Sequence, residues 1–158
     1  MASAKARLKA ELIKHLESEL ETARKSHEAA AAAATHEEAK AENDKDTRGL
    51  EQSYLARGHA IRVADLENAI VELNVFEPRV YREDDEIAVG ALVTVEDDDG
   101  TRQIWLVPHG GGITLGTGVT AIAPTSPLGG KLIGKAIDEE LEIVRAGTKR
   151  TVTIIGIE

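Results

Sequence analysis

The chain has no cysteine among its 158 residues, which excludes disulfides and zinc sites built from thiolates. It also has no apolar run of about eighteen residues and no apolar core of the signal-peptide kind. We therefore expect a soluble cytoplasmic protein without a membrane partner. An excess of positive charge is missing too: the net charge is −9, which argues against a basic nucleic-acid-binding module.

Proline and glycine are almost missing from the first half of the chain. Up to Phe76 there is no proline, and the only glycines are Gly49 and Gly58. All four prolines and the other twelve glycines follow. Because the first part is rich in strong helix formers and the second in turn and β-branched residues, we predict an α+β protein. The expected domains are residues 1–76, a helical hairpin, and residues 77–158, a small sheet domain.

The first part has the spacing of two long helices. One apolar face steps by three or four residues along the first arm, at Leu8, Leu12, Leu16, Leu20, Ala23, His27, Ala30 and Ala34. The return arm, residues 47–75, has its apolar positions at Leu50, Tyr54, Ile61, Val63, Leu66, Ile70 and Leu73. Gly58 weakens this helix and is interpreted as a close contact between the arms. Arms of about 30 residues would make an antiparallel coiled coil roughly 45 Å long.

The stretch between the arms, residues 35–46, is strongly acidic. Five carboxylates lie between Glu37 and Asp46. One interpretation is a solvated turn in which Asp44 or Asp46 caps the second helix. The other is that two carboxylates bind a divalent cation such as Mg²⁺ in a partner's site, because hard cations prefer oxygen ligands.

Basic residues flank the same turn. Lys40 and Lys45 lie within it, and Arg48 follows on the second arm. Ordinary surface charge explains them, and a track for a nucleic-acid strand near the tip is the alternative.

The second part is typical of short strands joined by turns. Strands are expected at residues 87–96, 101–107, 119–123, 140–144 and 150–157, with an Asp-rich turn before Gly100. Ser126 as N-cap and Pro127 at the first helical position predict a short helix that ends at Gly134. Trp105 is expected in the core. Residues 108–112, Pro-His-Gly-Gly-Gly, are interpreted as a flexible hairpin loop, because no Gly-x-Ser-x-Gly nucleophile turn accompanies them.

The run Ser-Pro-Leu-Gly-Gly-Lys-Leu-Ile-Gly-Lys at residues 126–135 resembles the C-terminal domain of the bacterial Gre transcription elongation factors, GreA and GreB. A helical hairpin followed by this domain is the architecture of that family. The resemblance implies an FKBP-like antiparallel-sheet domain with one short helix, which docks on RNA polymerase. It also implies that the coiled coil enters the secondary channel of the polymerase. The residues expected to contact the polymerase are Ser126, Pro127, Leu128, Gly129 and Lys131.

The resemblance further implies that tip carboxylates help to hold a catalytic Mg²⁺ in the polymerase active site, so that backtracked RNA is hydrolysed. The chain would then be no enzyme, would have no cofactor of its own, and would lie close to the RNA 3′ end and DNA. The family tip reads Asp-x-x-Glu-Asn. Glu42 and Asn43 match its last two positions, whereas the Asp position falls on Ala39, beside Glu38. The implied metal ligands are Glu42 and Glu38, with Lys40, Lys45 and Arg48 close to nucleic acid.

Three other functions stay open. A Gre-like protein could bind the polymerase and modulate or inhibit it without strong cleavage activity, because Ala39 has no carboxylate. The hairpin could instead belong to a coiled-coil adaptor protein. A prolyl isomerase is disfavoured because the second domain offers only Tyr81 and Trp105 to line an aromatic pocket. The chain is expected to be a monomer.

Overall fold

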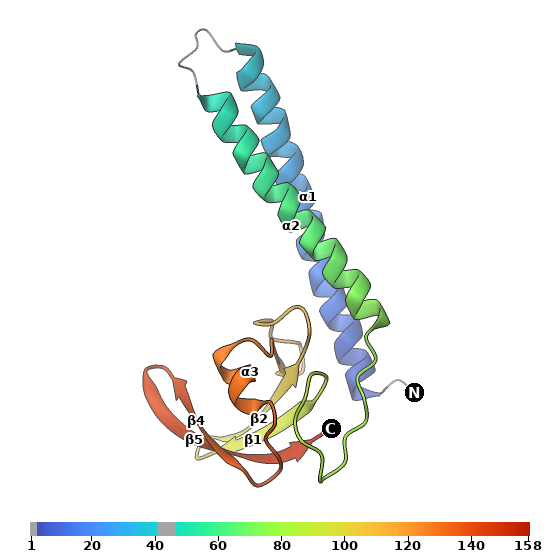
Figure 1. The fold of residues 1–158 in the computed structure, drawn as a ribbon, viewed down its shortest axis with the longest axis vertical. Coiled ribbons are helices and arrows are strands. Elements are labelled where there is room, and N and C mark those ends of the chain that lie inside the picture. The colour runs from blue at the N-terminus through green and yellow to red at the C-terminus, as the bar shows by residue number, and fades with distance from the viewer. Residues whose placement is uncertain (1–2, 41–46) are drawn as a thin grey trace. The chain divides into compact units, whose positions relative to one another are not determined.

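The computed structural model describes residues 3–40 and 47–158, and shows two long helices followed by a five-stranded sheet with one short helix (Figure 1). The chain divides into two compact units. One is Ile13–Asn74, and the other combines Val75–Glu158 with the start of the first helix up to Leu12. The predicted α+β fold class, a helical hairpin followed by a small sheet domain with one short helix, is confirmed.

Helix α1, Ala4–Lys40, is 37 residues long and buries the face that the sequence pattern predicts. The residues buried along it are Leu8, Leu12, Leu16, Leu20, Ala23, Ala30 and Ala34. His27, on the same face, is partly buried, and its Nδ1 lies 3.0 Å from the carbonyl oxygen of Ala56 on the opposite arm. His27 therefore has a packing role between the arms.

Helix α2, Arg48–Val75, is 28 residues long and differs from expectation in its first half. Leu66 and Leu73 are buried as predicted, but Leu50, Tyr54 and Ile61 are 53%, 61% and 58% exposed. The inner face carries small residues here, including the buried Gly49. Because small residues leave little apolar signal, the sequence pattern points to the larger side chains of the opposite stripe and not to the inner face.

Gly58 does not lie at the predicted close contact between the arms. A Cβ atom added at Gly58 would meet no atom within 4 Å, so this glycine marks no close contact between helices. Long polar side chains link the arms instead. Arg24 Nη2 lies 3.0 Å from Glu67 Oε1, and Arg62 Nη2 lies 2.8 Å from Glu19 Oε2.

The sheet has the strand order β3-β2-β1-β5-β4. The strands are β1 Leu92–Asp97, β2 Gly100–Leu106, β3 Thr120–Ile122, β4 Glu140–Arg145 and β5 Thr148–Ile157. All neighbours pair antiparallel except β2 and β3, which run parallel, so the sheet is mixed rather than wholly antiparallel. Its core is made of alternating side chains such as Val93, Val95, Leu106 and Ile154, against which α3, Pro127–Leu132, packs Leu132.

Two local expectations needed correction. The first strand starts at Leu92 rather than at residue 87, because a turn through Gly90, with φ +99°, precedes it. The indole N–H of the fully buried Trp105 donates to the carbonyl oxygen of Gly90 at 3.3 Å, which confirms Trp105 as a core residue. The glycine-rich segment after β2 is no hairpin loop, because the strands that it joins are parallel.

The start of α1 belongs to the sheet unit through specific contacts. Lys5 Nζ donates to the carbonyl oxygen of Arg79 at 2.9 Å, and Lys9 Nζ donates to that of Phe76 at 2.7 Å. Lys5 and Arg79 both lie over the ring of Tyr81, at 4.8 and 4.3 Å from its centroid. Among the described residues, no helix is both long and apolar enough to cross a membrane.

Candidate partner-docking surface

The hydroxyl of Ser126 sets the position at which α3 begins. Its Oγ accepts a hydrogen bond from the backbone N–H of Gly129 at 3.0 Å and donates to the carbonyl oxygen of Ala123 at 2.7 Å. Ser126 therefore caps the helix and also ties its first turn to the end of the preceding segment. Pro127 follows at the first helical positions, where its missing N–H costs nothing.

Gly129 lets α3 lie directly on the backbone of residues 123–124. A Cβ atom at this position would collide with the carbonyl oxygen of Ala123. Gly129 is buried, so it allows a close approach and presents no side chain to a partner. Of the five predicted docking residues, Ser126 and Gly129 thus position the helix, and Leu128 packs in part against the sheet core. Pro127 and Lys131 are exposed and are left to make contacts.

A shallow groove of about 240 Å³ lies between α3 and the edge strand β4. Three of the predicted residues line it, and four residues that the sequence did not single out complete it: Arg102, Ile143, Val144 and Arg145. Val144 is 67% exposed. An apolar side chain on an edge strand gives a weak sequence signal, because its exposure depends on the fold.

Positive charge gathers around this groove although the chain as a whole is acidic. Lys131 Nζ donates to the carbonyl oxygen of Glu142 at 2.8 Å, which holds the ammonium group over β4. Arg102 pairs with Asp97 at 3.3 Å, and Arg145 lies on the same rim. The groove therefore offers apolar contact from Pro127 and Val144 beside basic groups, and fits an apolar segment flanked by carboxylates.

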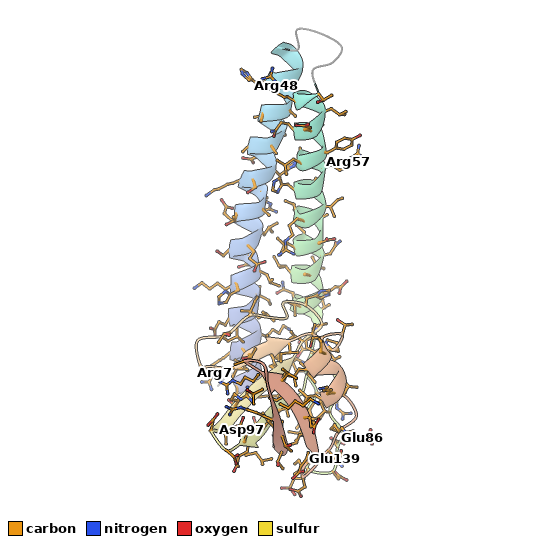
Figure 2. The ribbon with its side chains drawn as sticks, turned by 90° about the vertical axis from the view of Figure 1, so that its left-hand side faces the viewer. Arg7, Arg48, Arg57, Glu86, Asp97 and Glu139 are labelled. Carbon is orange, nitrogen blue, oxygen red and sulfur yellow. The ribbon has the colours of Figure 1, made fainter. Side chains whose placement is uncertain are left out.

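The predicted tip residues are only partly described. Glu42, Asn43 and Lys45 lie outside the described residues. Glu38 and Lys40 belong to the last turn of α1, and their side chains are not described. Arg48 is the first residue of α2 (Figure 2). Within the described ranges, no group of three metal-ligating side chains comes together.

The sheet unit is similar to a known protein family. Residues 82–158 match the family described as "Transcription elongation factor, GreA/GreB, C-term". Residues 82–158 of this chain therefore resemble a GreA/GreB C-terminal domain. The family resemblance of residues 126–135 is thereby confirmed, and the groove between α3 and β4 lies within the matched region.

A curated relative of the chain is a GreA protein. The transcription elongation factor GreA of Novosphingobium aromaticivorans is 34% identical over 90 residues, which cover 55% of this chain. The match spans about half of that GreA protein, 54% of its length.

Solved structures of Gre-related proteins are similar at lower identity. GreA factor homolog 1 of Thermus thermophilus is 22% identical with a TM-score of 0.41, over 92% of this chain and 94% of that one. A GreA/GreB factor of Nitrosomonas europaea is 18% identical with a TM-score of 0.37, over 58% and 78%.

Proposed function

We propose that this protein is a transcription elongation factor that binds bacterial RNA polymerase, acts in the cytoplasm, and docks through the groove between α3 and β4. The observation that carries the proposal is the match of residues 82–158 to the GreA/GreB C-terminal domain. The groove supports it, because Pro127, Leu128 and Lys131 gather there with Val144 and Arg145. We propose that a helix or loop of the polymerase with an apolar side chain beside carboxylates fills it.

We further propose that the hairpin carries Glu42 and Glu38 into the secondary channel of the polymerase. The 28 residues of α2 span about 42 Å at about 1.5 Å per residue, which gives the hairpin a long reach. Bound Mg²⁺ would supply Lewis acidity and an activated water to the polymerase's own hydrolysis of backtracked RNA. The carboxylate of Glu42 would help to hold that ion, and Asn43 would orient the same turn.

The remaining tip assignments follow from this placement. Lys40, Lys45 and Arg48 would face the phosphates of the RNA 3′ end, or of DNA, in the elongation complex. The protein itself would be no enzyme, because the reaction belongs to the polymerase.

One observation favours a second candidate function. Ala39 occupies the position where the family tip has an Asp, so one of the two expected carboxylates is displaced to Glu38. A ligand shifted by one residue along a helix points about 100° away, which would weaken its hold on the metal. The protein would then be a Gre-like modulator or inhibitor that enters the channel without strong cleavage activity.

Binding of the full chain to core RNA polymerase tests the docking proposal and separates it from a coiled-coil adaptor. We expect the wild type to co-purify with the polymerase. The double variant Pro127→Ala, Leu128→Ala should bind at least about tenfold more weakly. Val80→Ala is the matched control, because Val80 is an apolar residue of the same unit that is 89% exposed. Absence of wild-type binding, or equal binding by the double variant, would contradict the proposed docking surface.

A further inference from the structure

The outward side of α2 carries a second apolar stripe that the hairpin does not use. The stripe consists of Leu50, Tyr54, Arg57, Ile61, Ala64, Asn68 and Val71, and every member is exposed. Its residues are separated alternately by four and three positions, which is the spacing of a coiled-coil seam. We call this set the outer stripe. Arg57 marks the side of α2 that faces away from α1 (Figure 2).

The exposure is confined to one arm. Among the described residues of the hairpin, the large apolar side chains that are exposed all lie on α2 and none on α1. Four of them, Leu50, Tyr54, Ile61 and Val71, share the outer stripe and are 53–65% exposed. Scattered exposed apolar residues need no explanation, but a line of them at heptad spacing on a solvated helix indicates a binding surface.

The charges beside the outer stripe decide what can cover it. The positions one residue after Leu50, Ala64 and Val71 are Glu51, Asp65 and Glu72. Glu67, on the flank on the other side, is already paired with Arg24. No lysine or arginine stands at the flanking positions. In a coiled coil these positions meet the flanks of the partner, so two copies of this face would bring carboxylates against carboxylates. An anionic lipid surface would be repelled in the same way.

We propose that the outer stripe docks an amphipathic α-helix of a partner protein that carries lysine or arginine beside its apolar seam. The apolar residues supply the contact, the carboxylates select the basic flanks, and Arg57 and Asn68 within the seam fix the register. This surface lies on the hairpin and is independent of the proposed docking groove between α3 and β4.

Binding of two synthetic helical peptides, each of about four heptads, to the full-length chain tests the proposal. Both have leucine at the seam positions, one has lysine on both flanks, and the other has glutamate. Fluorescence anisotropy of the labelled peptides should show binding of the lysine peptide, weakened by salt, and no binding of the glutamate peptide. Equal binding of both peptides, or binding of neither, would overturn the proposal.

Two variants place the binding on the stripe. Ile61→Glu should weaken binding of the lysine peptide at least about tenfold. Leu55→Glu, the same change at a half-exposed leucine of α2 outside the stripe, should not weaken it. Since both variants add one negative charge, a loss confined to Ile61→Glu excludes general attraction to an acidic protein. Equal effects of the two variants, or a wild-type dimer that Ile61→Glu dissociates in sedimentation, would overturn the proposal.

Discussion

The side chain of Leu12 on α1 fills the space beside Gly110 in the loop between β2 and β3. Leu12 is fully buried, and a Cβ atom at Gly110 would lie 2.7 Å from its Cδ1. Gly110 also has φ +83°, a conformation that disfavours other residues. The start of α1 is therefore part of the core of the sheet unit, and the glycine-rich loop is shaped to receive it.

Gly110→Ala should destabilise the sheet unit by about 2 kcal/mol or more, because steric overlap adds to backbone strain. Urea unfolding followed by circular dichroism measures the loss. Gly112→Ala separates the two causes, since Gly112 has φ +92° in the same loop but open space around it. Equal losses for the two variants would show that Leu12 does not require the glycine.

The carboxylate of Glu11 makes a second link between α1 and this loop. Its Oε1 accepts a hydrogen bond from the backbone N–H of Gly116 at 2.5 Å. Glu11→Ala should lower the free energy of unfolding by about 1 kcal/mol, because a charge-assisted hydrogen bond is lost at an exposed site. Glu17→Ala, at an exposed position of the same helix, is the control for helix propensity. A similar loss of unfolding free energy in both variants would show that the hydrogen bond between Glu11 and Gly116 does not stabilise the protein.

Gly58 offers a stabilising substitution. Its surroundings are open, and glycine in a helix interior is less favourable than alanine by roughly 0.5–1 kcal/mol. We expect Gly58→Ala to raise the melting temperature without changing polymerase binding. A lower melting temperature would indicate a tight contact at this position after all.

The pH dependence of stability should report on Lys5. Burial lowers the pKa of Lys5, with Arg79 acting in the same direction and Glu158 opposing it. The pKa of Lys5 in the folded protein lies below its unfolded value of 10.5. At pH values between these two pKa values, Lys5 is therefore more protonated in the unfolded chain than in the folded protein. The contribution of Lys5 to stability should therefore rise with pH across that interval.

Thermal unfolding of the wild type and of Lys5→Met should be compared from about pH 8 to pH 10.5. All other groups titrate in both proteins, so the difference between the two melting temperatures isolates the contribution of Lys5. The melting temperature of the wild type should rise relative to that of the variant as the pH increases. A relative fall would mean that the folded state raises the pKa of Lys5 instead.

The strong patterns in the sequence predicted the fold well. The inner face of α1, seven leucines and alanines with His27 among them, is regular over eight positions. The Ser126-Pro127 start of α3 is chemically specific. The patterns failed where small residues carry the packing, as on the inner face of α2 near Gly49. They also failed where pairing is non-local, because nothing in residues 120–122 reveals that β3 pairs parallel with β2.

The docking surface was predictable only in part. Pro127, Leu128 and Lys131 are contiguous and belong to a specific run, so the sequence identified them. Arg102, Val144 and Arg145 join them only through the fold, because the side chains on β2 and β4 reach the same groove across the sheet and helix. The capping role of Ser126 was anticipated, whereas the close approach at Gly129 required the backbone of Ala123.

RNA cleavage in stalled, backtracked elongation complexes tests the central claim most directly. We predict that the wild-type protein accelerates cleavage by the polymerase, and that Glu42→Ala with Glu38→Ala reduces this acceleration at least about tenfold while polymerase binding is kept. Glu37→Ala, in the same acidic segment, should retain it. If the double variant accelerates cleavage as strongly as the wild type does, or the wild type gives no acceleration, then the tip carboxylates do not act in the active site of the polymerase.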